Sequence, residues 1–136
     1  MFVKHAKYDP RDCFVYIENN TCRIVFNNTD TEVKCQYDHN NQVMTILITI
    51  GNSTMTTHVH FKSNIIDIGE IPFKKFENYY TIDDVFILNV KNDEKGTLSI
   101  GYGIKNSNEF ILNAGYITDK SVVTGFFTFD ISSDNS

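Results

Sequence analysis

Residues 13–37 read CFVYIENNTCRIVFNNTDTEVKCQY and carry the strongest structural signal in the chain. Cys13 to Glu18 and Thr21 to Phe26 flank the pair Asn19-Asn20. Asparagine tolerates the left-handed backbone that a two-residue hairpin turn requires. A second turn is expected at Asn27 to Asp30, so this stretch predicts three consecutive antiparallel strands.

The register of these strands follows from the side chains. If Phe26 pairs with Thr31, Ile24 lies opposite Val33 and Cys22 lies opposite Cys35. A slip of one residue would move every side chain to the other face of the sheet and mix apolar with polar positions. One face then carries Cys22, Ile24, Phe26, Val33, Cys35 and Tyr37, and the other carries Arg23, Val25, Glu32, Lys34 and Gln36.

The rest of the chain repeats this pattern of short alternating runs and polar turns. Gly96 is expected to take a positive φ in a hairpin loop, and Gly125 to form a bulge. Phe73, Phe76 and Tyr80 recur at helical spacing after Pro72, which allows at most one short helix near residues 73–80. The further strands are expected at Val43 to Ile50, Thr54 to Phe61, Val85 to Lys91, Thr97 to Gly103, Glu109 to Ile117 and Val122 to Ile131.

Composition supports an all-β fold. Ile, Thr and Val supply 39 of the 136 residues, whereas Ala and Leu together supply six. Branched side chains lose rotamer freedom in helices and pack well on pleated sheets. We therefore predict an antiparallel two-sheet sandwich of jelly-roll-like topology with eight or nine strands, formed by one domain over residues 1–131 and followed by a short flexible tail at 132–136.

Charge and hydropathy exclude several classes of function. The net charge is −5, there are two arginines, and lysines do not cluster with aromatic residues, which disfavours nucleic-acid binding. No apolar run is long enough for membrane insertion. Charged residues near Met1 interrupt the apolar core that a signal peptide would need, so we expect a cytoplasmic protein, or a virion protein if the source is viral.

The three cysteines, at positions 13, 22 and 35, lack the spacing of a zinc site. Their odd number and the absence of a signal peptide indicate reduced thiols. Cys22 and Cys35 lie opposite each other in the expected register. They are therefore either a disulfide or two small buried hydrophobic residues.

His58 and His60 are the sharpest candidates for a metal site. Residues i and i+2 of a strand point to the same face, so the two imidazoles are close enough to share a metal. The pair, preceded by Gly51, resembles the His-x-His motif of cupins, and that resemblance implies metal binding. Cupins place a carboxylate within a few residues, whereas residues 61–64, Phe-Lys-Ser-Asn, contain none. The alternative is two half-exposed polar side chains on an outer face.

Other motifs give no specific assignment. The acidic turns at 83–84, 92–94 and 130–135 lack the Asp-x-Asp-x-Asp-Gly pattern of a calcium loop. Gly101-Tyr102-Gly103 lies within an expected strand, which favours close packing over phosphate binding. Without tryptophan, the chain also lacks the platform of a galectin-like site. Because no nucleophile or acid–base pair is recognisable, we expect no enzyme activity and no cofactor.

The predicted function is a non-catalytic binding or assembly module. Residues whose codons are AT-rich dominate the composition, so we favour a viral structural or accessory protein from an AT-rich genome. Val25, Ile87 and Phe126 add apolar residues to the outer faces, which favours a protein partner or self-association. A carbohydrate-binding, lectin-like domain is the first alternative, and a cupin-like protein that uses His58 and His60 is the second.

Overall fold

The computed structural model describes residues 2–27, 29–74, 76–92, 95–105 and 108–131. Among these residues the structure has twelve β-strands and no helix. They are β1 (Phe2–Tyr8), β2 (Cys13–Glu18), β3 (Thr21–Phe26), β4 (Thr31–Asp38), β5 (Val43–Ile50), β6 (Ser53–His60), β7 (Ile65–Asp67), β8 (Phe76–Ile82), β9 (Val85–Asn92), β10 (Gly96–Lys105), β11 (Glu109–Ile117) and β12 (Val122–Asp130). The prediction of an all-β fold is confirmed, whereas the strand count of eight or nine was too low.

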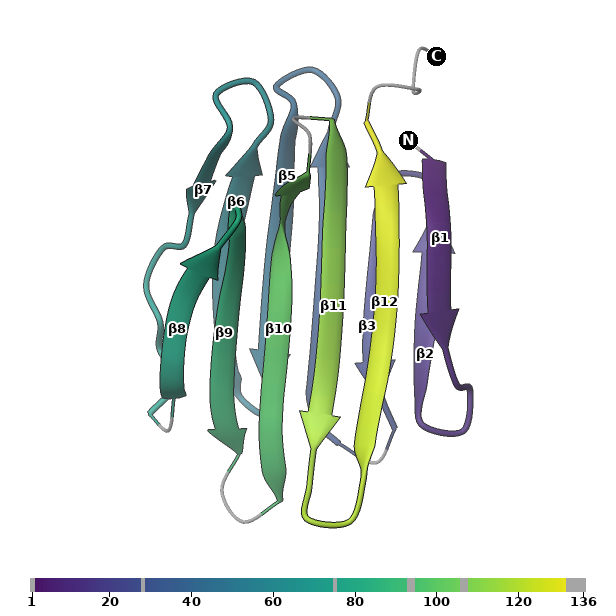
Figure 1. Cartoon of the computed structure of the whole chain (residues 1–136), viewed down its shortest axis with the longest axis vertical. Coiled ribbons are helices and arrows are strands. Elements are labelled where there is room, and N and C mark those ends of the chain that lie inside the picture. Colours follow the sequence, from purple (N-terminus) through teal and green to yellow (C-terminus); the bar gives the residue numbers. More distant parts are fainter. Residues whose placement is uncertain (1, 28, 75, 93–94, 106–107, 132–136) are drawn as a thin grey trace.

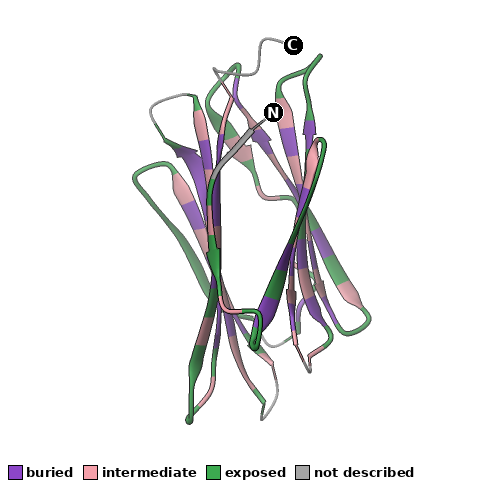
Figure 2. Ribbon diagram, turned by 90° about the vertical axis from the view of Figure 1, so that its right-hand side faces the viewer, coloured by how far each residue is buried: buried purple, intermediate pink, exposed green. Residues whose placement is uncertain are grey.

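The strands form two antiparallel sheets of six. Sheet A has the order β1-β12-β11-β10-β9-β8, and sheet B has the order β2-β3-β4-β5-β6-β7. The chain begins in sheet A, crosses to sheet B, crosses back at β8 and ends with β12 beside β1 (Figure 1). The two sheets form facing layers (Figure 2). The predicted sandwich is confirmed, but each sheet is mainly a meander and not the pair of Greek keys that defines a jelly roll.

Three strands were missing from the sequence prediction. In β1, a register shift between Val3 and His5 interrupts the alternation of apolar and polar residues. β7 has only three residues. The third, β8, occupies most of the segment in which at most one short helix near 73–80 was expected, and no helix forms there among the described residues.

The helical spacing at 73–80 has another cause. Phe73 belongs to the segment that crosses between the sheets, and its side chain is buried in the hydrophobic core. Phe76 and Tyr80 lie on β8. β8 pairs with β9 through a two-residue turn in which Asp83 and Asp84 have φ values of 50° and 63°. Such a turn fixes a hairpin, and the hairpin pairing overrides the weak helical pattern.

The predicted registers of the local hairpins are confirmed. Cys22 pairs with Cys35 and Ile24 with Val33 between β3 and β4. Between β9 and β10, the apolar residues of 85–91 and 97–103 pair as their alternation predicts: Leu98 with Val90, Ile100 with Leu88 and Tyr102 with Phe86. The inward faces of both sheets bury these apolar residues in one core.

Two glycine predictions were wrong. Gly96 does not have a positive φ; it is needed because a Cβ there would lie 2.5 Å from the carbonyl oxygen of Ile117. Gly125 sits in unbroken register with Ala114, so it forms no bulge. A Cβ at Gly125 would instead lie 3.1 Å from Cγ2 of Ile24, so this glycine lets the two sheets approach each other.

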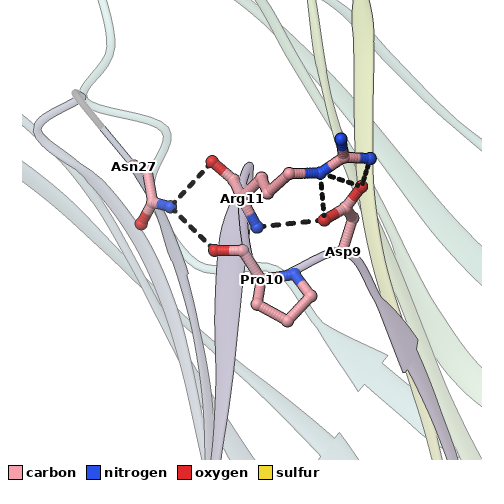
Figure 3. A network of polar contacts seen from close by, with 4 residues as sticks. All are labelled: Asp9, Pro10, Arg11 and Asn27. Carbon is pink, nitrogen blue, oxygen red and sulfur yellow. Dashed lines mark hydrogen bonds and ion pairs between the residues drawn. The ribbon is translucent and has the colours of Figure 1, made fainter.

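A polar network holds the first crossover between the sheets. Arg11 bonds the carboxylate of Asp9, with 2.7 Å between Nη2 and Oδ2. The side-chain amide of Asn27 donates to the carbonyl oxygens of Pro10 and Arg11 at 3.3 and 3.1 Å (Figure 3). This network ties the turn between β1 and β2 to the end of β3. The predicted tail at 132–136 lies outside the described residues.

Candidate functional site

His58 and His60 lie half-buried on the outer face of sheet B. Their ring centroids are 6.2 Å apart, which agrees with the predicted common face. The register places Asp67 of β7 opposite His58, so a carboxylate does lie on a neighbouring strand. Sequence spacing missed it because β7 was not predicted. The described part of the chain nevertheless contains no group of three His, Cys, Asp or Glu side chains arranged to hold a metal ion.

The three cysteines are free and fully buried. Burial raises the pKa of Cys22 to about 12 and raises the pKa of Cys35 well above its ordinary value. Cys13 also has a raised pKa, mainly because it is desolvated, and its thiol contacts the carbonyl oxygen of Thr124 at 3.6 Å. Protonated thiols are poor nucleophiles, so these residues act as small core side chains.

The acidic and glycine-rich motifs have structural roles where they are described. Asp83 and Asp84 form the exposed turn between β8 and β9. Gly103 packs beneath this turn, because a Cβ there would overlap the backbone of Asp84 and Val85. The expectation of close packing is therefore confirmed at Gly103, whereas a Cβ at Gly101 would have ordinary contacts at 3.7 Å or more. The acidic residues at 93–94 and in the tail lie outside the described residues.

One end of the sandwich carries a polar pocket of about 430 Å³. It lies where the turn between β2 and β3 meets the turn between β4 and β5. The Nε2 of His39 lies 3.0 Å from the side-chain oxygen of Asn20, and the His39 ring packs edge-on against Tyr37. Asp38 accepts bonds from Asn40 and Asn41, and the side-chain bond from Asn41 is the main reason that the Asp38 pKa is lowered. The lining residues are Asn20, Gln36, Tyr37, Asp38, His39, Asn40 and Thr45.

The opposite end has a pocket of about 370 Å³ with a different character. Its apolar wall includes Ile50, Phe73 and Tyr116, and Lys74, Lys91 and Lys95 lie at its rim. Thus the two ends of the molecule differ in charge and polarity.

Sheet A has two edges, which are formed by β1 and β8. All seven residues of β8 are exposed, and among the described residues this strand pairs only with β9. Phe76, Tyr79, Tyr80 and Ile82 have exposed fractions between 38% and 52%. A free edge of this length normally carries protecting features such as lysine, proline or a covering loop, because its unpaired backbone groups recruit other strands. Within β8 the only charged residue is Glu77.

Apolar side chains continue from this edge across the outer face of sheet A. Tyr80 pairs with Ile87, and Ile82 pairs with Val85. Val25, Ile87 and Phe126, which the sequence placed on outer faces, are all half-buried within the chain. The outer apolar residues are therefore only partly covered by the protein itself.

Comparisons with known protein families, with curated proteins and with solved structures find no match. No helix among the described residues is long and apolar enough to cross a membrane. The candidate sites are thus defined by their own geometry.

Proposed function

We propose that this chain is a non-catalytic assembly module that pairs through β8 with a second copy of itself. The single observation that carries the proposal is the exposure of a seven-residue edge strand with large apolar side chains on both of its faces. Pairing would satisfy the free backbone groups and cover Tyr79 and Tyr80. An AT-rich composition supports a viral structural or accessory role, in the virion or the cytoplasm.

Absence of catalysis is part of the same proposal. It is supported by the buried thiols, whose raised pKa values keep them protonated. The outer-face histidines lie half-buried on a sheet face, with one carboxylate, Asp67, on the neighbouring strand. These arrangements lack the mutually positioned groups that general acid–base or nucleophilic catalysis needs.

Sedimentation velocity over a range of protein concentrations tests the proposal. The wild-type chain is expected to form dimers, and Tyr80→Lys is expected to weaken dimerisation at least about tenfold, because lysine on an edge strand opposes pairing. Tyr16→Lys is the matched control, since Tyr16 and Tyr80 are both 44% exposed and both lie on outer faces. A strictly monomeric wild type, or equal effects of the two substitutions, would contradict the proposal.

Carbohydrate binding is the second candidate, and the polar end pocket favours it. Its amide, carboxylate and hydroxyl groups lie beside the exposed ring of His39, which packs against the buried Tyr37, a composition that suits sugar hydroxyls and a sugar face. A glycan array followed by NMR titration tests this candidate. Binding that Gln36→Ala abolishes and Thr56→Ala preserves would support it, and an array without any bound glycan would reject it.

A further inference from the structure

We infer that two copies of β8 pair antiparallel about a two-fold axis at Tyr79, and that Lys74 of each copy meets the acidic turn of the other. This inference rests on the proposed function and specifies the register in which the two β8 strands pair. Two-fold pairing makes each residue of one strand face a fixed residue of the other, so the sequence around β8 can be compared with its own reverse.

The backbone limits the registers that can form. Across an antiparallel pair, hydrogen-bonded and non-hydrogen-bonded residue pairs alternate. Ile82 and Val85 flank the two-residue turn and form the hydrogen-bonded pair that closes the hairpin. Thr81 and Tyr79 therefore direct their backbone N–H and C=O groups away from β9. A two-fold axis must bring such outward-directed residues together, which permits centres at Tyr79, between Tyr79 and Thr81, or at Thr81.

Charge distinguishes these centres. An axis at Tyr80, midway between Tyr79 and Thr81, would bring Glu77 close to Asp83 of the other copy, and like charges placed opposite each other are destabilising. An axis at Thr81 would shorten the overlap and leave Phe76 without a partner. With the axis at Tyr79, Asn78 faces Tyr80 on the outer side. Glu77 is then not close to Asp83 of the other copy and Phe76 keeps a partner, so both problems are avoided.

The ends of the strand complete the match. One residue is inserted between Phe76 and Asn78, so Phe76 comes opposite Thr81, and both face inward. Lys74, two residues before the strand, then reaches the turn of Asp83 and Asp84 in the other copy. All three side chains are exposed, and none of them has an ion-pair partner among the residues that the structure describes. Each dimer would contain this contact twice.

A double-mutant cycle on the dimer dissociation constant tests the register. Lys74→Gln and Asp83→Asn are each expected to weaken dimerisation by about 2-fold to 25-fold, because an exposed pair contributes about 0.2–1 kcal/mol and is lost twice. The double variant is expected to be little weaker than either single variant. Lys34→Gln, which removes an exposed lysine from the outer face of sheet B, is the control and should leave dimerisation unchanged.

Cysteine substitution gives a second measurement of the same register. The three native thiols are buried, so an introduced cysteine is the reactive one. Under mild oxidation Tyr79→Cys is expected to form a disulfide-linked dimer faster than Tyr80→Cys.

The outcomes separate the inference from the proposed function. If Tyr80→Lys disrupts the dimer but Lys74→Gln behaves like Lys34→Gln, or if Tyr80→Cys crosslinks faster, β8 pairs in another register and the inference is wrong. If the wild type is monomeric, both the inference and the proposed function fail.

Discussion

Arg11 and Asp9 show how a single exposed contact sets the properties of one residue. Hydrogen bonds from Arg11 lower the pKa of Asp9 from 3.8 to about 2. Because the folded pKa lies below the unfolded one, the contribution of this pair to stability is present above pH 3.8 and is lost as the pH falls toward 2. We expect NMR titration to give a pKa near 2 for Asp9 and a higher pKa in Arg11→Gln, where only the backbone N–H of residue 11 still donates to the carboxylate. A normal pKa in the unsubstituted chain would show that the contact does not persist in solution.

Gly125 is needed for the packing of the two sheets, because its missing side chain lets sheets A and B approach each other. A Cβ there would lie 3.1 Å from Ile24 and 3.4 Å from the sulfur of Cys13. Gly125→Ala is expected to lower the free energy of unfolding by about 1–3 kcal/mol, as overpacked cores do. Gly115→Ala, whose Cβ would have ordinary contacts at 3.7 Å, is the control and should be neutral or slightly stabilising in urea denaturation. Equal effects would disprove the close approach at Gly125.

Individual hairpins were predictable because their registers depend on residues close in sequence. The pairs Cys22–Cys35 and Val90–Leu98 follow from alternation alone. β8 was missed because its turn uses two aspartates with positive φ, a conformation more often signalled by Asn-Gly or Asp-Gly. The carboxylate beside His58 was missed for a related reason, since a three-residue strand gives too short a pattern to recognise.

The turn between β8 and β9 gives a prediction for the whole hairpin. Asp84 has a φ of 63°, which suits glycine and strongly disfavours β-branched residues. We expect Asp84→Val to lower the free energy of unfolding by about 1–2 kcal/mol relative to Asp84→Gly. Chemical denaturation of both variants at low protein concentration measures this difference without a contribution from dimers. Equal stability would mean that the turn adopts another conformation.

The arrangement of the whole molecule could not be derived from local patterns. Which strands belong to which sheet depends on the two crossovers, and the pairing of β1 with β12 joins opposite ends of the chain. The end pockets are also properties of the whole fold, since the polar pocket combines Asn20 with residues of the turn after β4. The alternation of apolar and polar residues correctly indicated apolar side chains on the outer faces, but it did not indicate that β8 borders them.

Hydrogen exchange measured at low and high protein concentration tests the central claim, that β8 pairs with a second copy of the chain. In an isolated chain, the outward backbone N–H groups of Tyr79 and Thr81 lie at an open edge and should exchange rapidly. If two copies pair through β8, a peptide spanning residues 76–82 becomes protected as the protein concentration rises, whereas peptides from the interior strand β10 exchange equally at both concentrations. Exchange of the 76–82 peptide that is independent of concentration would mean that β8 does not pair with a second copy.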